Sequence, residues 1–263
     1  MKFEDYTTLL FSRDGGILNV QFNNPTKLNS LSGAGEREIS RFFYDVATDE
    51  ETRVIVLSGA GRAFSAGGDI RHVKHVIEHP EEFYFGIGNA KRTVFNILDC
   101  AKPIIAKVNG DAAGLGATIA LLCDVVFAAN EAKFSDPHVK IGFTAGDGGA
   151  VIWPFLLGGL AKHYLMTGDP IVATDAAKLG MIFKALPPEE LDEAVRAYAQ
   201  RLATGPRRAI ETTKLTANVV LKHLATMSMD AGMAYEALTN HSGDHQEACE
   251  AFLAKRPPQF TGQ

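Results

Sequence analysis

The chain has 263 residues, 46% of them hydrophobic and 22% charged, and its formal net charge is -5 at pH 7. This composition is typical of a globular protein with a sizeable core, and it offers no basic surface for nucleic acid. The three cysteines, an odd number without a CxxC pair, argue against a disulfide framework or a zinc ribbon and fit a reducing compartment.

The N-terminal segment, MKFEDYTTLLFSRDGG, carries acids where a secretory signal is basic and then apolar. The longest uncharged apolar stretch, residues 150–161, is too short to cross a bilayer and is interrupted by Pro154. We therefore expect a cytoplasmic protein that acts on small molecules, with neither a membrane nor nucleic acid as a partner.

The first 130 residues alternate between strand and helix patterns. Residues 6–23 predict two strands around a turn at 13–16, residues 33–48 a helix, and residues 53–59 a short buried strand. The pattern repeats as a helix over 83–99, a strand over 102–110, a helix over 114–124 and a strand over 125–130. Strand, helix and strand in this order indicate parallel crossovers, so we expect an α/β fold.

The rest of the chain is predominantly helical. A loop rich in glycine, proline and aspartate, residues 135–149, leads into a helix predicted over 150–166. Gly180 is placed to end the next helix and Pro206 to begin a later one, and residues 191–202 carry one apolar stripe. We therefore divide the chain into an α/β core, residues 1–190, and a helical C-terminal region, residues 191–263.

Two glycine-rich turns, GRAFSAGGDI (residues 61–70) and DAAGLG (residues 111–116), each follow a predicted buried strand and precede a helix. The first is no phosphate-binding P-loop, because Asp69 and Ile70 stand where that loop needs a lysine and a serine or threonine. The second is no dinucleotide fingerprint, because Ile119 replaces its third glycine. Either both are ordinary turns, or together they aim two backbone N–H groups at one carbonyl oxygen, as an oxyanion hole requires.

Four segments occur in the order AFSAGGDI, KPIIAKVNGDAAGLGATIALLCDVVFAANEAKFSDP, GDGG and LMTGDPIVATDAAKLGMI. With them the chain resembles the enoyl-CoA hydratase/isomerase superfamily, also called the crotonase family, from about residue 5 to beyond residue 185. The resemblance implies a spiral of ββα units with a C-terminal helical region that covers the active site and forms trimers, commonly paired into hexamers. It also implies an acyl-CoA thioester as substrate, with coenzyme A as part of that substrate and no separate cofactor.

The resemblance assigns the two N–H groups of the oxyanion hole to Gly68 and Leu115, which would hold the thioester oxygen while an enolate forms. Leu115 replaces a glycine that is usual in many relatives, but a main-chain donor does not depend on the side chain. The helix that begins near Leu115 would add its positive N-terminal end. Lys27 would pair with a phosphate of coenzyme A. The alternative is that it is a surface lysine exposed to solvent. The residues expected to contact coenzyme A are Lys27, Leu28, Ala66, Asp69 and Ile70.

The catalytic positions depart from the commonest pattern of the superfamily. Its hydratases use two glutamates to activate water; the resemblance puts Thr118 and His138 at those positions, so we do not expect hydration by that route. His138 can act as a general base or acid near neutrality. Asp147 would orient it or act as a second acid–base group, and Thr118 would supply a pocket hydroxyl. Alternatively, Asp147 only caps the following helix and His138 is a loop histidine bonded to backbone.

Three functions remain open. The first is an acyl-CoA enzyme, a lyase or isomerase, that stabilises a thioester enolate. The second is a carbon–carbon bond hydrolase resembling the β-diketone hydrolases of the superfamily, such as 6-oxocamphor hydrolase, although Leu115 stands where they carry a histidine. The third is a non-catalytic acyl-CoA-binding subunit. We expect no metal site, because histidines at helical spacing are typical of solvated faces: His72, His75, His79, His241 and His245.

Overall fold

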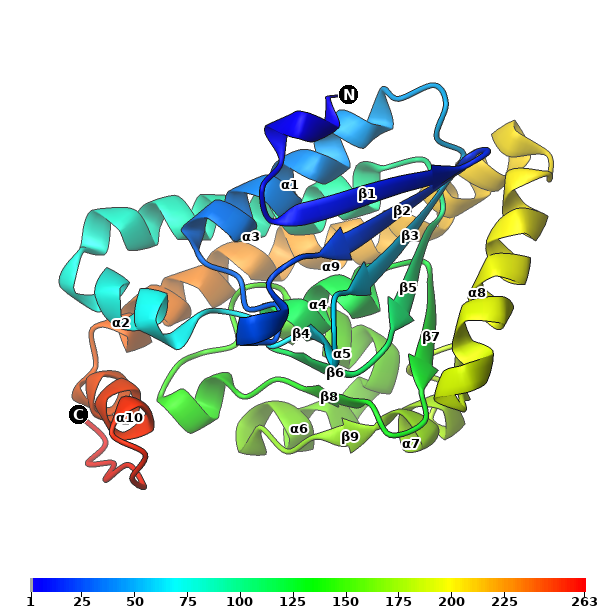
Figure 1. Ribbon diagram of the computed structural model, residues 1–263. Helices are drawn as coiled ribbons and strands as arrows, with labels where there is room; N and C mark the ends of the chain where they lie inside the picture. Colours follow the sequence, from blue (N-terminus) through cyan, green and yellow to red (C-terminus); the bar gives the residue numbers. More distant parts are fainter. Residues whose placement is uncertain (1) are drawn as a thin grey trace.

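A computed structural model describes residues 2–263 and contains two β-sheets enclosed by helices (Figure 1). In spatial order, the large sheet consists of β1 (Leu9–Asp14), β2 (Ile17–Phe22), β3 (Val54–Gly59), β5 (Ile104–Val108), β7 (Val125–Ala129) and β10 (Lys184–Leu186). The strands β1 and β2 form the predicted antiparallel hairpin, and all further neighbours are parallel. The helix α1 (Gly33–Ala47) joins β2 to β3, which confirms the expected crossover.

Four short strands form a second sheet: β4 (Ala63–Ser65), β6 (Asp111–Ala113), β8 (Lys133–Ser135) and β9 (Ile171–Val172). The strands β4, β6 and β8 directly follow β3, β5 and β7 of the large sheet. The chain thus places one strand in each sheet, turns into a helix and repeats, which is the expected spiral of ββα units. The sequence did not predict this sheet, because two or three residues are too few to show alternation.

Helices enclose both sheets. The helix α8 (Pro188–Ala203) packs against β2, β3, β5 and β7 of the large sheet. The helix α3 (Pro80–Asp99) packs against α1, and the fully buried α4 (Leu115–Leu122) lies against α3, α5 (Gly149–Leu157) and β4 to β6. The other helices are α2 (Ile70–Glu78), α6 (Ala161–Thr167), α7 (Ala173–Lys178), α9 (Arg207–Asn240) and α10 (Gly243–Leu253), with short 3-10 helices at Phe3–Asp5, Pro25–Lys27, His138–Ile141 and Gly158–Leu160.

Two predicted helix limits are wrong. The helix expected over residues 150–166 is interrupted between α5 and α6, because Gly158 adopts φ 56° and ψ -135°, which an α-helix cannot contain. Pro206 precedes α9 as its cap residue, and the helix begins at Arg207. Gly180 confirms its prediction, since it adopts φ 73° just beyond the end of α7.

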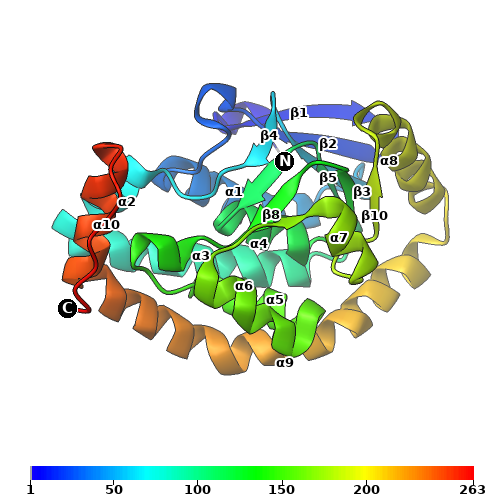
Figure 2. The ribbon, with the colours of Figure 1, turned by 90° about the horizontal axis from the view of Figure 1, so that it is seen from below.

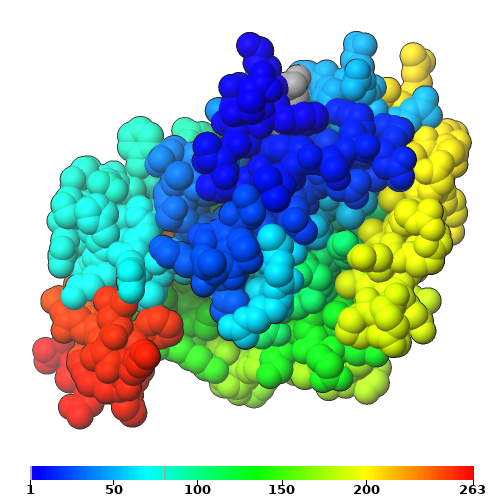
Figure 3. All heavy atoms as spheres, viewed as in Figure 1, coloured from blue at the N-terminus to red at the C-terminus, as the bar shows by residue number. Residues whose placement is uncertain are grey.

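The long helix α9 belongs to the C-terminal region and runs along the core (Figure 2). It packs against α3 and α5, and α10 then packs against α2; Figure 3 shows this C-terminal segment (red) against the segment around α2 (cyan). The expected boundary between residues 190 and 191 falls in the first turn of α8, and the division into two domains stays a prediction. None of the helices in residues 2–263 is both long and apolar enough to cross a membrane.

Candidate active site

The two glycine-rich turns lie side by side, because the strands before them, β4 and β6, are parallel neighbours. Gly67 has φ 77°, and a Cβ there would lie 2.5 Å from the carbonyl oxygen of Ala113 and 3.3 Å from the nitrogen of Leu115. Only glycine therefore allows the turns to approach this closely. Gly68 and Leu115 both line a cavity at this junction. Among the described residues, neither of their N–H groups donates a backbone hydrogen bond.

This inner cavity has a volume of about 160 Å³ and lies between the turns, α2, α3 and the end of α9. An apolar pocket with a few converging polar groups is the usual form of a small-molecule site. Its apolar wall consists of Ile70, Val73, Val76, Phe83, Ile87, Ala90, Ile141, Phe143 and Met233, and its polar wall of Glu36, His72, Glu82, His138, Asp147, Glu236 and Asn240.

A second, outer cavity of about 370 Å³ shares the wall residues Ala66 and Pro137 with the inner cavity. Three cationic side chains line the outer cavity, those of Arg62, Lys133 and Lys140. An extended ligand with an anionic end and an apolar end thus has complementary surfaces at both ends of this pair of cavities.

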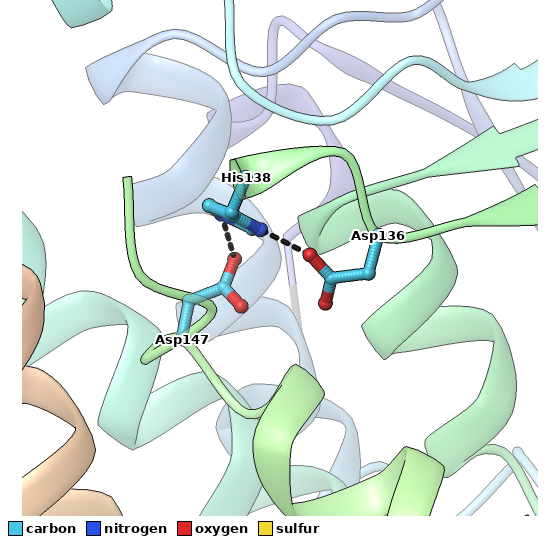
Figure 4. Close-up of side chains that lie close together, drawn as sticks. All are labelled: Asp136, His138 and Asp147. Atoms are coloured by element: carbon cyan, nitrogen blue, oxygen red, sulfur yellow. Dashed lines mark hydrogen bonds and ion pairs between the residues drawn. The ribbon is translucent and has the colours of Figure 1, made fainter. Parts of the chain in front are cut away.

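His138 lies between two aspartates (Figure 4). Its Nδ1 is hydrogen-bonded to the fully buried Asp136, and its Nε2 lies 3.6 Å from Oδ2 of Asp147. Burial lowers the pKa of His138, but the negative charges of Asp136 and Asp147 outweigh burial and raise that pKa to about 10. The imidazole ring is therefore a cation at neutral pH.

Asp147 has both of the contacts considered from the sequence. Its Oδ1 accepts a hydrogen bond of 3.5 Å from the N–H of Gly149, the first residue of α5, and its Oδ2 faces His138. Burial raises the pKa of Asp147, and the charge of His138 opposes this effect. Asp147 thus lies one residue before Gly148, the N-cap residue of α5, and pairs with the histidine. Its part in acid–base chemistry stays a prediction.

Two further carboxyl groups line the inner cavity, the buried Glu236 from α9 and the half-buried Glu36 from α1. Burial, together with the charge of Asp147, raises the pKa of Glu236 to about 8 and that of Glu36 to about 7. At pH 7 the carboxyl group of Glu236 therefore carries a proton for most of the time. The cavity thus offers a neutral proton donor beside the His138 cation.

Of the five residues predicted to contact coenzyme A, three line a cavity, and Lys27 and Asp69 line neither of the two. Leu28 and Ala66 line the outer cavity, and Ala66 and Ile70 line the inner one. Lys27 and Asp69 form an ion pair of 2.7 Å with each other. A phosphate would have to compete with Asp69 for Lys27, and with Asp169, 3.4 Å away, for Lys140. Arg62 and Lys133 have no ion pair within the described residues and are better placed for that ligand.

Two other predicted positions differ from expectation. Thr118 is fully buried in α4, its hydroxyl group has no hydrogen-bond partner within the described chain, and it lines neither cavity. Its methyl group instead lies against Gly148, where a Cβ would come within 2.9 Å of it. His245, expected on an exposed face, is fully buried, with its Nδ1 bonded to the carbonyl oxygen of Ile141 and its ring stacked on Phe143.

In the part of the chain that the structure describes, one group of three potential metal ligands lies within 4.8 Å: Asp136, His138 and Asp147. The His138 cation already lies between these two carboxylates and offsets part of their charge. The expectation of no metal site stays a prediction. His75 on α2 and His79, which lies between α2 and α3, stack on each other with their ring centroids 3.9 Å apart.

Comparison with known proteins decides the family. The profile described as enoyl-CoA hydratase/isomerase matches residues 12–263. The chain belongs to the enoyl-CoA hydratase/isomerase family. One relative, the 1,2-epoxyphenylacetyl-CoA isomerase of Escherichia coli, is 33% identical over 256 residues, which cover 94% of this chain and 96% of the relative. Another, the crotonyl-CoA hydratase of Syntrophomonas wolfei, is 31% identical over 262 residues, which cover 97% of this chain and 98% of the relative.

Solved structures of enoyl-CoA hydratase/isomerase proteins share this fold. One from Mycobacterium paratuberculosis has a TM-score of 0.89 at 32% identity, covering 94% of this chain and 99% of its own. A beta-diketone hydrolase from the cyanobacterium Anabaena, bound to (S)-3-oxocyclohexyl acetic acid, has a TM-score of 0.83 at 30% identity, covering 91% of this chain and 96% of its own. The expected crotonase-like fold is confirmed.

The sequence analysis missed two site residues of this family member, Asp136 and Glu236. Asp136 lies in the segment Ser-Asp-Pro directly before His138. An aspartate two residues before a candidate catalytic histidine could have been predicted as its partner. Glu236 gave a weaker signal. The buried residues at this end of α9 are Met229, Met233, Glu236 and Asn240. Glu236 and Asn240 are thus polar residues on the buried, otherwise apolar face of the helix, where polar residues are uncommon.

Proposed function

We propose that this chain is an acyl-CoA enzyme whose reaction passes through a thioester enolate, with the enolate oxygen bound by the N–H groups of Gly68 and Leu115. One observation carries the proposal: a histidine cation held between two buried aspartates lines the same cavity as two neighbouring N–H groups without backbone acceptors. Donors and charges fixed in advance around a developing oxyanion are what stabilises such an intermediate.

The proposed chemistry is proton transfer at the carbon next to the thioester carbonyl. Asp147 takes the proton, the C–H electron pair becomes the double bond of the enolate, and the carbonyl π pair moves onto the oxygen. The raised pKa of Asp147 makes it a stronger base than an ordinary aspartate. His138, already protonated, stabilises the negative charge and gives its proton to the enolate in the second half of the reaction. The proton held by Asp147 then passes to His138, which restores both groups.

Coenzyme A would extend from the inner cavity past Ala66 and Pro137 into the outer one. There Arg62, Lys133 and Lys140 would meet its phosphates, while the acyl group occupies the apolar inner cavity. The names of both relatives above contain an acyl-CoA, which supports the same substrate class. Hydration by two glutamates is not part of the proposal, because Thr118 and His138 stand at those positions.

Titration calorimetry with butyryl-CoA tests this proposal. We expect binding by the wild type, and no binding of butyrate, which lacks the part that fills the outer cavity. His138→Gln should keep the binding heat and lose turnover, because the substitution removes the charge at the reacting centre but leaves the outer cavity intact. Absence of heat with butyryl-CoA would overturn the assignment to acyl-CoA. Binding without turnover on a panel of enoyl-, dienoyl- and oxoacyl-CoA thioesters would favour a non-catalytic binding subunit.

A second candidate is hydrolysis of a carbon–carbon bond in a β-diketone without coenzyme A. The observation that favours it is the histidine at position 138, together with a similar solved structure that is a beta-diketone hydrolase. Turnover of a cyclic 1,3-diketone by the wild type, lost in His138→Ala, would support this candidate. Turnover of CoA thioesters alone would exclude it.

We also propose that the chain forms trimers through its C-terminal region. Large apolar side chains are exposed along α9: Val219, Val220, Met227, Tyr235 and Leu238. Such a face on a long helix is typical of a subunit interface. Light scattering coupled to size exclusion should give three or six times the chain mass of 28.3 kDa, and a monomer would contradict the proposal. The cytoplasmic location expected from the sequence stays a prediction.

A further inference from the structure

Two polar side chains on the last turns of α9 have no hydrogen-bond partner although they are buried. Asn240 is fully buried, and neither its Nδ2 nor its Oδ1 has a partner within the described residues. Glu236, one turn earlier, is 8% exposed, and its Oε2 also lacks a partner there. Both side chains line the inner cavity. In folded proteins nearly all buried polar atoms are hydrogen-bonded, so three such atoms on one cavity wall require an explanation.

The loop at residues 144–146 packs against this end of α9. Thr239, between them, accepts a hydrogen bond of 3.1 Å from the N–H of Thr144 through its hydroxyl oxygen. Gly146 of the same loop lies directly against Glu236, since a Cβ at this position would overlap its Oε2. The loop therefore anchors this end of α9, and its packing against Oε2 limits how far the Glu236 carboxyl group can turn.

We propose that Glu236 and Asn240 form a subsite for a second oxygen function on the acyl group, a ketone or a hydroxyl, apart from the thioester carbonyl. This inference rests on the proposed acyl-CoA function and names the substrate class within it. The Asn240 amide can donate to a carbonyl oxygen and accept from a hydroxyl group. The Glu236 carboxyl group can donate in its protonated form and accept in its ionised form.

The protonation of Glu236 supports this chemistry. Burial, followed by the nearby charge of Asp147, raises the pKa of Glu236 to about 8. At pH 7 the group therefore offers an O–H donor, which suits a ketone oxygen. A neutral carboxyl group also avoids the penalty of an uncompensated anion in an apolar pocket.

The cavity also limits the size of the acyl group. Its volume of about 160 Å³ is close to that of engineered apolar cavities of about 150 Å³, which bind benzene. Phe83, Phe143, Ile87 and Met233 are part of its apolar lining. An acyl group of about the size of a six-membered ring, with an oxygen substituent, fits both features.

The test compares cyclohexylacetyl-CoA with its 2-, 3- and 4-oxo derivatives by titration calorimetry. We expect at least one oxo derivative to bind the wild type about tenfold more tightly than cyclohexylacetyl-CoA, because it pairs groups that otherwise stay unpaired. Asn240→Leu, which keeps the side-chain size, should strongly reduce the ratio of the two affinities. Glu236→Gln should also change this ratio. Binding of cyclohexylacetyl-CoA should change little in either variant.

Thermal unfolding provides a matched control on the same helix. Asn218 resembles Asn240, but its Nδ2 donates to the carbonyl oxygen of Leu98. Asn218→Leu should therefore lower Tm, whereas Asn240→Leu should leave Tm unchanged or raise it, since no hydrogen bond is lost. A fall in Tm for Asn240→Leu as large as that for Asn218→Leu would show a structural role and contradict the subsite.

The possible failures are distinguishable. If none of these thioesters binds, the proposed acyl-CoA function is wrong, and the subsite with it. If cyclohexylacetyl-CoA and its oxo derivatives bind equally well, the acyl-CoA function stands and the subsite is wrong. In that case water hydrogen-bonds to Glu236 and Asn240 as well as the oxo group does. If the oxo preference exists but survives both Asn240→Leu and Glu236→Gln, other residues recognise the oxygen and this inference is wrong.

Discussion

Stability should fall steeply as the pH rises from 7 to 8, because the folded protein keeps protons that the unfolded chain releases. The pKa of His138 is about 10 in the folded protein against an ordinary 6.5, so its stabilising charge is fully present below 6.5 and is lost as the pH rises through 10. The pKa of Glu236 is about 8 against 4.5. Between pH 4.5 and pH 8 the Glu236 carboxyl group is ionised in the unfolded chain and largely protonated in the folded one. This difference also favours unfolding as the pH rises.

One retained proton changes the free energy of unfolding by about 1.4 kcal/mol per pH unit. Two retained protons would give about 3 kcal/mol, and since Glu236 is half ionised at pH 8, we expect a loss of about 2 kcal/mol between pH 7 and pH 8. Glu36, with a pKa of about 7, has largely ionised by the upper end of this range and adds little. Glu236→Gln removes one of the two protons and should reduce the loss to about 1 kcal/mol.

Urea unfolding at fixed protein concentration measures this loss, with the fluorescence of Trp153, the single tryptophan, as the signal. Glu51→Gln is the control: the Glu51 side chain is 78% exposed, and we expect the wild-type slope for this variant. A wild-type stability that does not change from pH 7 to pH 8 would refute the reasoning. So would a Glu236→Gln variant with the same pH dependence as the wild type.

Three further predictions concern the site. Asp136→Asn should lower the pKa of His138, as measured by NMR titration, because it removes a negative charge beside the ring. It should also destabilise the fold by about 3 kcal/mol or more. An unchanged pKa of His138 would contradict the charge pairing. Gly67→Ala should destabilise by about 1–3 kcal/mol through φ alone, with an added clash against Ala113, and should weaken butyryl-CoA binding; wild-type binding would show that the turns need not meet. Lys133→Ala should weaken binding of butyryl-CoA more at low salt than at high salt, and an unchanged Kd would remove phosphate binding from the outer cavity.

Local features of the chain were predictable because they depend on neighbours in sequence. The first five large-sheet strands and the helices after them follow from apolar runs and periodicity, and the two glycine turns from their place between strand and helix. The sixth strand, β10, was not predicted, because it lies in a stretch interpreted as predominantly helical. The His138 and Asp147 side chains were expected together because one loop carries both, and they lie 3.6 Å apart, but the side chain hydrogen-bonded to the ring is that of Asp136. Their catalytic roles remain a matter for experiment.

Other features depend on contacts that no local pattern contains. Glu236 reaches the cavity because α9 packs on α3 and α5 far along the chain, and burial then shifts its pKa. Asp136 was visible in the sequence, but its complete burial was not. Gly158 interrupts a predicted helix through its backbone angles, which composition alone does not specify. Thr118 points into the interior because α4 is buried on all sides.

The central claim is that the site makes an enolate from a thioester, and hydrogen exchange at carbon tests it without knowledge of the natural substrate. Butyryl-CoA incubated with the protein in D2O should gain deuterium next to the thioester carbonyl, as measured by mass spectrometry. Leu115→Pro removes one N–H at the first residue of α4, where proline is tolerated, and should slow exchange about 100-fold or more. Leu115→Ala, which keeps the N–H, should exchange like the wild type. Bound butyryl-CoA that gains no deuterium, or Leu115→Pro that exchanges as fast as Leu115→Ala, would contradict the account.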